Sequence, residues 1–142
     1  MTDRVLMVDD DLCTGCRICE LWCSLEHGGV INTTKSRIRV RRDHRTLSNQ
    51  AVVCLQCSDR FCIDACPPKT LALSLDEGTG AVLVDWEKCT GCKKCVEACP
   101  YDGIHLLAEE KKVILCDLCA GDPECVKRCP EGVLSCAARG ED

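Results

Sequence analysis

Sixteen of the 17 cysteines in this 142-residue chain fall into four short groups, and only Cys136 lies outside them. Each group has three closely spaced cysteines and a fourth that follows after three intervening residues. In chain order, groups one to four are Cys13, Cys16, Cys19 and Cys23; Cys54, Cys57, Cys62 and Cys66; Cys89, Cys92, Cys95 and Cys99; Cys116, Cys119, Cys125 and Cys129. Clustered thiolates are ligands for soft metal centres, so the first question is which centre this spacing suits.

Three kinds of cysteine chemistry compete. Disulfides need an oxidising compartment, and C-x-x-C pairs close loops too small to stabilise much. A structural zinc site usually takes two such pairs separated by a longer loop. The run C-x2-C-x2-C-x3-C-P is instead typical of bacterial ferredoxins that bind [4Fe–4S] clusters. Groups one and three have this spacing, and groups two to four are followed by proline. The pattern therefore favours four [4Fe–4S] clusters.

The spacing also predicts local structure. Three thiolates of one tight loop would surround a cluster, and Gly15 and Gly91 would let the backbone approach it closely. We expect the fourth cysteine to begin a helix that turns away from the loop, so that this cysteine reaches the neighbouring cluster, with the proline near the helix start. Groups two and four have longer inserts, "SDRF" and "AGDPE", and group one has Ser24 where the others have proline. We expect these loops to bulge without displacing the ligands.

Alternating apolar residues predict the strands around these loops. The segment between groups two and three has two such runs on either side of "DEGTG", which predicts a β-hairpin, and residues 103–115 form a second hairpin candidate. The run "SRIRVRRD" predicts a strand with one basic face, either an ordinary solvated edge or a docking surface for an acidic partner. The fold class is therefore α+β, with two bacterial-ferredoxin-like modules. The inner module, residues 50–110, would be inserted into an outer module of residues 1–49 and 111–142.

Composition restricts the function further. The chain is 46% apolar, but cysteines supply much of that and aromatic residues only 3%, so bound metal must contribute to folding. The net charge of −5 disfavours nucleic acid as a partner. No apolar run approaches the roughly 20 residues of a membrane span, and no export signal is visible in "MTDRVLMVDDDLC", so we expect no membrane span and a cytoplasmic location.

Nothing in the sequence indicates catalysis by this chain alone. It contains no Gly-rich nucleotide-binding motif. His27, His44 and His105 are dispersed, and we expect them at surface or hairpin positions rather than as ligands. Each iron would have its own thiolate, which leaves no open coordination position. Electron transfer is the remaining function, and no catalytic residue is predicted.

The arrangement of all sixteen cysteines, over roughly residues 5–135, resembles the four-cluster ferredoxin-type electron-transfer subunits of molybdenum and tungsten oxidoreductases. In that family the two outer groups exchange their fourth cysteines, and so do the two inner groups. The resemblance implies the following ligand sets, one to four: Cys13, Cys16, Cys19 and Cys129; Cys116, Cys119, Cys125 and Cys23; Cys54, Cys57, Cys62 and Cys99; Cys89, Cys92, Cys95 and Cys66.

The resemblance also implies partners. One would be a catalytic subunit with a tungsten or molybdenum cofactor, such as an aldehyde oxidoreductase, and the other a flavin or ferredoxin redox partner. The short chain is also similar to the small subunit of a tungsten benzoyl-CoA reductase, and subunits of formate dehydrogenase or hydrogenase complexes stay open. The alternatives are a free polyferredoxin that shuttles electrons between enzymes, an iron–sulfur regulator and a zinc-bound adaptor. Copies of the chain could also stack end to end.

Overall fold

The computed structural model describes residues 4–67 and 71–138. Within these ranges it has four α-helices, three 3-10 helices and eight strands. The helices are α1 (Ile18–Gly28), α2 (Phe61–Ala65), α3 (Lys94–Ala98) and α4 (Glu124–Arg128), with η1 (Asp10–Leu12), η2 (Thr33–Lys35) and η3 (Leu118–Gly121). The strands are β1 (Arg4–Val8), β2 (Arg39–Asp43), β3 (Ser48–Val52), β4 (Leu73–Leu75), β5 (Val82–Val84), β6 (Ile104–Leu107), β7 (Lys112–Leu115) and β8 (Leu134–Ala138).

The strands of the described residues form four separate two-stranded antiparallel sheets. The predicted hairpins are confirmed as β4–β5 and β6–β7. The basic run is confirmed as a strand too, because β2 pairs with β3 and places Val40 opposite Ala51. The fourth sheet joins distant parts of the chain, since β1 pairs with β8.

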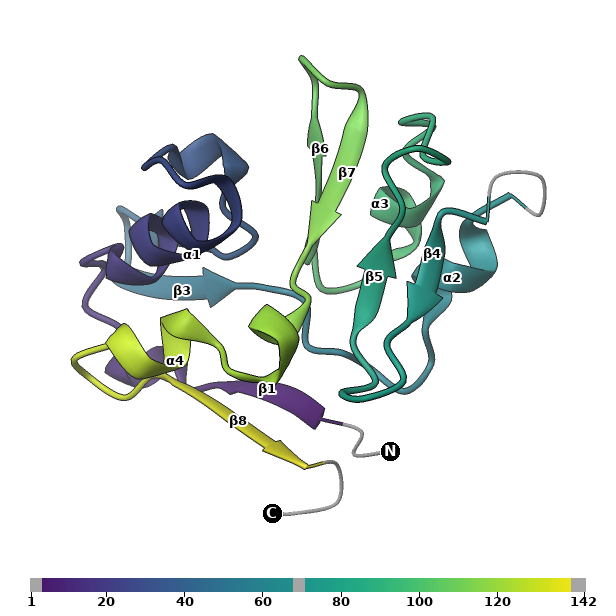
Figure 1. Ribbon diagram of the computed structural model, residues 1–142. Helices are drawn as coiled ribbons and strands as arrows, with labels where there is room; N and C mark the ends of the chain where they lie inside the picture. The colour runs from purple at the N-terminus through teal and green to yellow at the C-terminus, as the bar shows by residue number, and fades with distance from the viewer. Residues whose placement is uncertain (1–3, 68–70, 139–142) are drawn as a thin grey trace.

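The helices pack in two pairs. Helix α1 lies against α4, and α2 lies against α3 (Figure 1). The first pair lies on the side of the molecule where β1 and β8 run, and the second lies beside β4 and β5. Cysteine groups one and four therefore meet, as do groups two and three. None of the helices in the described residues has the length and hydropathy needed to cross a bilayer.

The prediction that the fourth cysteine begins a helix is wrong. The third cysteine of each group lies inside a helix, and in groups two to four the fourth cysteine is the C-cap: Cys66 for α2, Cys99 for α3 and Cys129 for α4. The reason is the proline that follows, because it forces the preceding residue out of the helical region. Accordingly, these C-caps have ψ values of 126°, 116° and 115°.

Group one shows what happens without that proline. Helix α1 runs through Cys23 and Ser24 and ends only at Gly28, so it has 11 residues where α2, α3 and α4 have five each. Ser24 is compatible with the longer helix because its hydroxyl donates to the Leu21 carbonyl oxygen at 2.9 Å and accepts the Asn32 N–H at 3.2 Å. A single residue after the last cysteine thus decides the helix length.

Cysteines form a large part of the core. Eight of them are buried, and the third member of every group is among these. Around them pack small and medium aliphatic side chains, including the fully enclosed Ile38, Val82, Ile114 and Leu118. A core built this way brings the thiols to the interior, where a bound metal can hold the helix pairs together.

Candidate metal centres

Two cavities are each lined by four cysteines drawn from two groups. One is lined by Cys54, Cys57, Cys62 and Cys99. The other is lined by Cys13, Cys16, Cys19 and Cys129. The remaining lining of both is largely apolar. Each cavity contains one complete ligand set that the family resemblance implies, so these eight sulfurs converge as a cluster would require.

Most of the other thiols lie close enough together for the charge of one to affect the pKa of another. Burial is the main cause that raises the pKa values of Cys116, Cys119 and Cys125, and the charge of Cys23, from a distant part of the sequence, raises all three as well. The charges of Cys89 and Cys92 raise the pKa of Cys95. Cys66 caps α2, which packs against the helix that carries Cys95. The described geometry is thus compatible with all four sets.

The thiols are costly to ionise where they lie. Burial is the main cause that raises the pKa of Cys19, Cys54 and Cys125 to about 12 in each case, and the charges of nearby thiolates, with that of Glu20 at Cys19, contribute to these values. A bound cation reverses this balance, because it favours the thiolate form and cancels the repulsion between neighbours. Four thiols converge in each of the two cavities, and this donor set fits an iron–sulfur centre, whose iron–sulfide core is cationic.

Backbone N–H groups also point at the sulfurs. The Arg37 N–H donates to Cys23 Sγ at 3.3 Å, and the Leu118 N–H donates to Cys116 Sγ at 3.4 Å. The loop of group four makes room for its longer insert with left-handed backbone at Leu118, Cys119 and Ala120. A backbone N–H hydrogen bond to sulfur stabilises a thiolate ligand.

His27 is a residue whose place the sequence did not reveal. It was expected at a surface or hairpin position, but it is on α1 with Nε2 at 2.9 Å from Asp117 Oδ1 and Nδ1 at 3.8 Å from Cys23 Sγ. The hydrogen bond to Asp117, followed by that to Cys23, raises the pKa of His27 to about 10. Burial disfavours the Cys23 thiolate, but the hydrogen bonds from His27 and Arg37 outweigh it and lower the Cys23 pKa. Only the i, i+4 spacing of Cys23 and His27 on a helix could have indicated this contact.

Known proteins share this arrangement. The family model described as "4Fe-4S dicluster domain" matches residues 46–139, which is more than half of the chain. The polyferredoxin-like subunit of the aliphatic sulfonate oxidoreductase of Pyrococcus furiosus is 48% identical over 89% of this chain and 71% of that protein. The electron transport protein HydN of Escherichia coli K12 is 32% identical over 98% of this chain and 90% of its own length.

The chain belongs to the 4Fe-4S dicluster domain family. It is an iron–sulfur electron-transfer protein and not an enzyme by itself. Among solved structures, the active site complex BamBC of benzoyl coenzyme A reductase with 1,5-dienoyl-CoA matches with a TM-score of 0.59 and 24% identity, over 100% of this chain and 79% of that one. At this identity the match shows the ferredoxin-like fold alone, which combines helices and strands as predicted.

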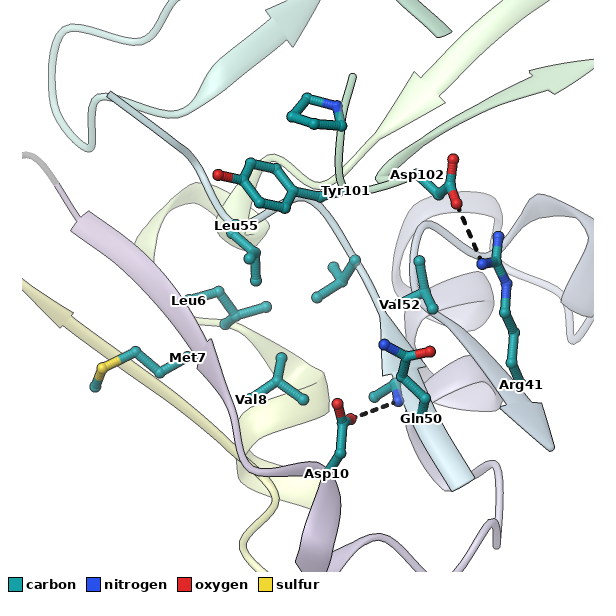
Figure 2. Close-up of a pocket in the computed structure, with 13 residues that line it drawn as sticks. Leu6, Met7, Val8, Asp10, Arg41, Gln50, Val52, Leu55, Tyr101 and Asp102 are labelled. Atoms are coloured by element: carbon teal, nitrogen blue, oxygen red, sulfur yellow. Dashed lines mark hydrogen bonds and ion pairs between the residues drawn. The ribbon is translucent and has the colours of Figure 1, made fainter. Parts of the chain in front are cut away.

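Another groove has no cysteine in its lining. It has a volume of about 550 Å³ and lies between β1, β3 and residues 100–102 (Figure 2). The ion pair of Arg41 with Asp102, at 3.2 Å, and the hydrogen bond from the Ala51 N–H to Asp10, at 3.0 Å, lie at its edges. Tyr101 lines both this groove and the cavity of Cys54 and Cys99. The groove is therefore a surface feature beside a cysteine site, not a cluster site.

Proposed function

We propose that the chain holds four [4Fe–4S] clusters, one in each cysteine set, and conducts electrons between a catalytic subunit and a second redox partner. The observation that carries this is the lining of two cavities by complete sets of four thiols from separate groups. When bound, such clusters accept and release single electrons. The chain's own contribution is to fix the thiolates, donate N–H groups to sulfur and keep half of the sixteen ligands buried.

Neighbouring thiols of different sets support a linear order. The charge of Cys19 in set one raises the pKa of Cys125 in set two. Cys54 in set three acts on Cys116 in set two, and Cys62 in set three acts on Cys95 in set four. Sets one, two, three and four would follow one another in this order. Each neighbouring pair is close enough for the charge on one thiolate to affect the other.

Exposure supports the same order. In the described residues, Cys16 and Cys92 are the exposed cysteines, and they belong to sets one and four. The second cysteines of the two middle sets, Cys57 and Cys119, are only half-exposed, so the two ends of the proposed row would be the more open to solvent. Electrons would enter at one end and leave at the other, because transfer to a partner needs a close approach to a cluster edge.

The modular organisation stays part of this proposal. The outer module would be residues 1–49 with 111–142, and the inner module residues 50–110. The pairing of β1 with β8 and of α1 with α4 supports an outer unit, and the packing of α2 on α3 supports an inner one. Both proposed boundaries fall within hairpins, β2–β3 and β6–β7, so the modules would share these hairpins.

We further propose a cytoplasmic complex with a tungsten or molybdenum oxidoreductase subunit, such as an aldehyde oxidoreductase, and with a flavin or ferredoxin partner. The support is the number and spacing of the cysteine groups, together with a relative named as a subunit of an aliphatic sulfonate oxidoreductase. The exposed ends at Cys16 and Cys92 would suit a freely diffusing polyferredoxin equally well. Isolation of the native complex separates the two proposals.

Metal analysis of the anaerobically purified chain tests the clusters. We expect about sixteen irons per chain, and about four fewer in Cys62→Ala or Cys92→Ala. The matched control is Cys136→Ala, which changes the cysteine outside the four groups and should keep all of the iron. A protein dominated by zinc, or equal iron loss in the control, would overturn the assignment.

The partner needs a separate measurement. The chain would be isolated from its native host under anaerobic conditions, and the mass and metal content of its complex determined. We expect a stoichiometric complex that contains tungsten or molybdenum. Migration of the chain alone at 15.6 kDa would instead establish the free carrier, and a mass at multiples of 15.6 kDa without another protein would establish stacking of copies.

A further inference from the structure

A polar cavity separate from the cysteine cavities lies between α1, η2, β2 and β6. Its volume is about 370 Å³. It is lined by Arg17, Glu20, Thr33, Thr34, Arg39, Val40, Arg41 and His105. Neither a cysteine nor a large apolar side chain is among them. The lining instead gathers three guanidinium groups and an imidazole in a chain whose net charge is −5.

Part of this positive charge is already paired. Arg17 contacts Glu20 Oε2 at 3.2 Å, and Arg41 contacts Asp102 Oδ2 at 3.2 Å on the exposed side. Glu20 is the one carboxylate in the lining, and its Oε1 also accepts the Val40 N–H at 2.7 Å. Among the described residues, Arg39 forms no ion pair with a carboxylate, so the lining keeps a net positive charge.

Two buried nitrogens in this lining have no hydrogen-bond partner. One is Nε of Arg39. The guanidinium group of Arg39 is held in place because its Nη2 donates to the Thr34 carbonyl oxygen at 2.9 Å. The other is Nε2 of His105. Burial, and then the charges of Arg39 and Arg41, lower the pKa of His105 to about 4. A buried polar atom without a partner is costly. Arg39 Nε always carries a proton and needs an acceptor, and His105 Nε2 needs one in the tautomer that has its proton on that nitrogen.

We propose that this cavity binds a small oxyanion, such as sulfate, phosphate or a free carboxylate, with Arg39 Nε and His105 Nε2 as its donors. Water could satisfy the two nitrogens but could not balance the guanidinium charges. An oxyanion does both, since charge-assisted hydrogen bonds from arginine to oxyanions are among the strongest in proteins. Neutral His105 would donate through Nε2, with its proton on that nitrogen.

The cavity also adjoins a cysteine site. Arg17 and Val40 line both this cavity and the one formed by Cys13, Cys16, Cys19 and Cys129. A bound oxyanion would therefore add negative charge next to the exposed end of the proposed row of clusters. The binding itself depends only on the basic lining and does not rest on the proposed direction or partner of electron transfer.

Titration calorimetry on the anaerobic holoprotein tests the proposal. Sulfate, phosphate and acetate would each be titrated at constant ionic strength, with chloride as the reference anion. We expect one site per chain for at least one of these oxyanions, with binding about tenfold or more weaker in Arg39→Gln and in His105→Gln. The matched control, Arg42→Gln, removes an exposed arginine of the same strand that is not part of the lining, and should bind as the parent does.

Iron content and the visible absorption spectrum show whether each variant keeps its fold and clusters. If Arg39→Gln loses iron, the oxyanion affinity of His105→Gln is compared with that of the parent instead. Heats no larger than those for chloride, or equal affinity in the parent and both lining variants, would overturn the proposal. Because the readout is anion binding, a failed test of the redox partner would leave this result unaffected.

Discussion

Gln56 Nε2 donates a hydrogen bond to the backbone carbonyl oxygen of Cys116 at 2.6 Å, across 60 residues of sequence. The Gln56 side chain is fully buried, and its Oε1 accepts the Val82 N–H at 3.0 Å. One amide thus connects the loop of group two with strand β5 and with the first cysteine of group four. Cys54 and Cys116 lie next to this amide, and they are the neighbouring thiols of sets three and two in the proposed row.

Gln56→Glu should destabilise the protein, because a carboxylate can still accept from Val82 but cannot donate to Cys116. We expect a loss of about 1–3 kcal/mol, the usual cost of a buried group left without its partner. The measurement is the midpoint of thermal unfolding of the anaerobic holoprotein, followed by circular dichroism. Gln50→Glu, the same change at an exposed position, is the control. Equal midpoints for the two variants would show that the Gln56 bridge is unimportant.

Gly91→Ala should destabilise the loop of group three. Gly91 has φ of +75°, and an added Cβ would clash with the Lys111 carbonyl oxygen. The left-handed backbone alone costs a residue with a side chain about 1–2 kcal/mol. Gly28→Ala is the control, since Gly28 ends α1 and no atom lies within 4 Å of its added Cβ. That change should be neutral or stabilise by up to about 1 kcal/mol. Both effects are measured as shifts in unfolding midpoint, and a Gly91 variant as stable as the parent would contradict the geometry.

Removal of iron should unfold the chain. Eight cysteines lie in the core, and burial raises the pKa of thiols such as Cys54 to about 12. Without metal, these groups contribute little packing and hold the two helix pairs together poorly. We expect an anaerobic chelator to abolish the helical circular dichroism signal in parallel with the visible absorption of the clusters. A compact, iron-free protein with unchanged circular dichroism would show that the polypeptide folds without its clusters.

Acid should weaken the fold through His105. Burial, and then the charges of Arg39 and Arg41, lower its pKa from 6.5 to about 4, with a small opposing effect of Asp102. Between these values the unfolded chain binds a proton that the folded chain does not, so stability is lost as the pH falls from 6.5 toward 4. In chloride buffer, we expect His105→Gln to lose less stability than the parent between about pH 7 and about pH 5. Parallel losses in both proteins would contradict the lowered pKa.

The sequence predicted some elements well and others poorly, for identifiable reasons. Alternating apolar residues around "DEGTG" were sufficient to predict β4–β5, because both strands and their turn are contiguous. In groups two to four, a helix was predicted to begin at the fourth cysteine, but a helix ends there instead. Proline is common just past the end of a helix as well as near its start, so the sequence did not distinguish the two positions. Cys99 shows the outcome, because it caps α3 instead of beginning a helix. His27 was missed because its partner Asp117 lies 90 residues away.

The sequence by itself determined the kind of chemistry, because the types and spacing of the cysteines in each loop are local properties that suit iron–sulfur clusters. It also indicated β2, the hairpins β4–β5 and β6–β7, and the need for glycine at Gly91. Only the tertiary structure decided which groups meet, since the pairing of β1 with β8 and the packing of α1 on α4 depend on contacts across the whole chain. The same long-range packing buried Gln56 against Cys116 and enclosed Arg39 and His105 in one cavity. Neither arrangement is encoded by any short stretch of residues.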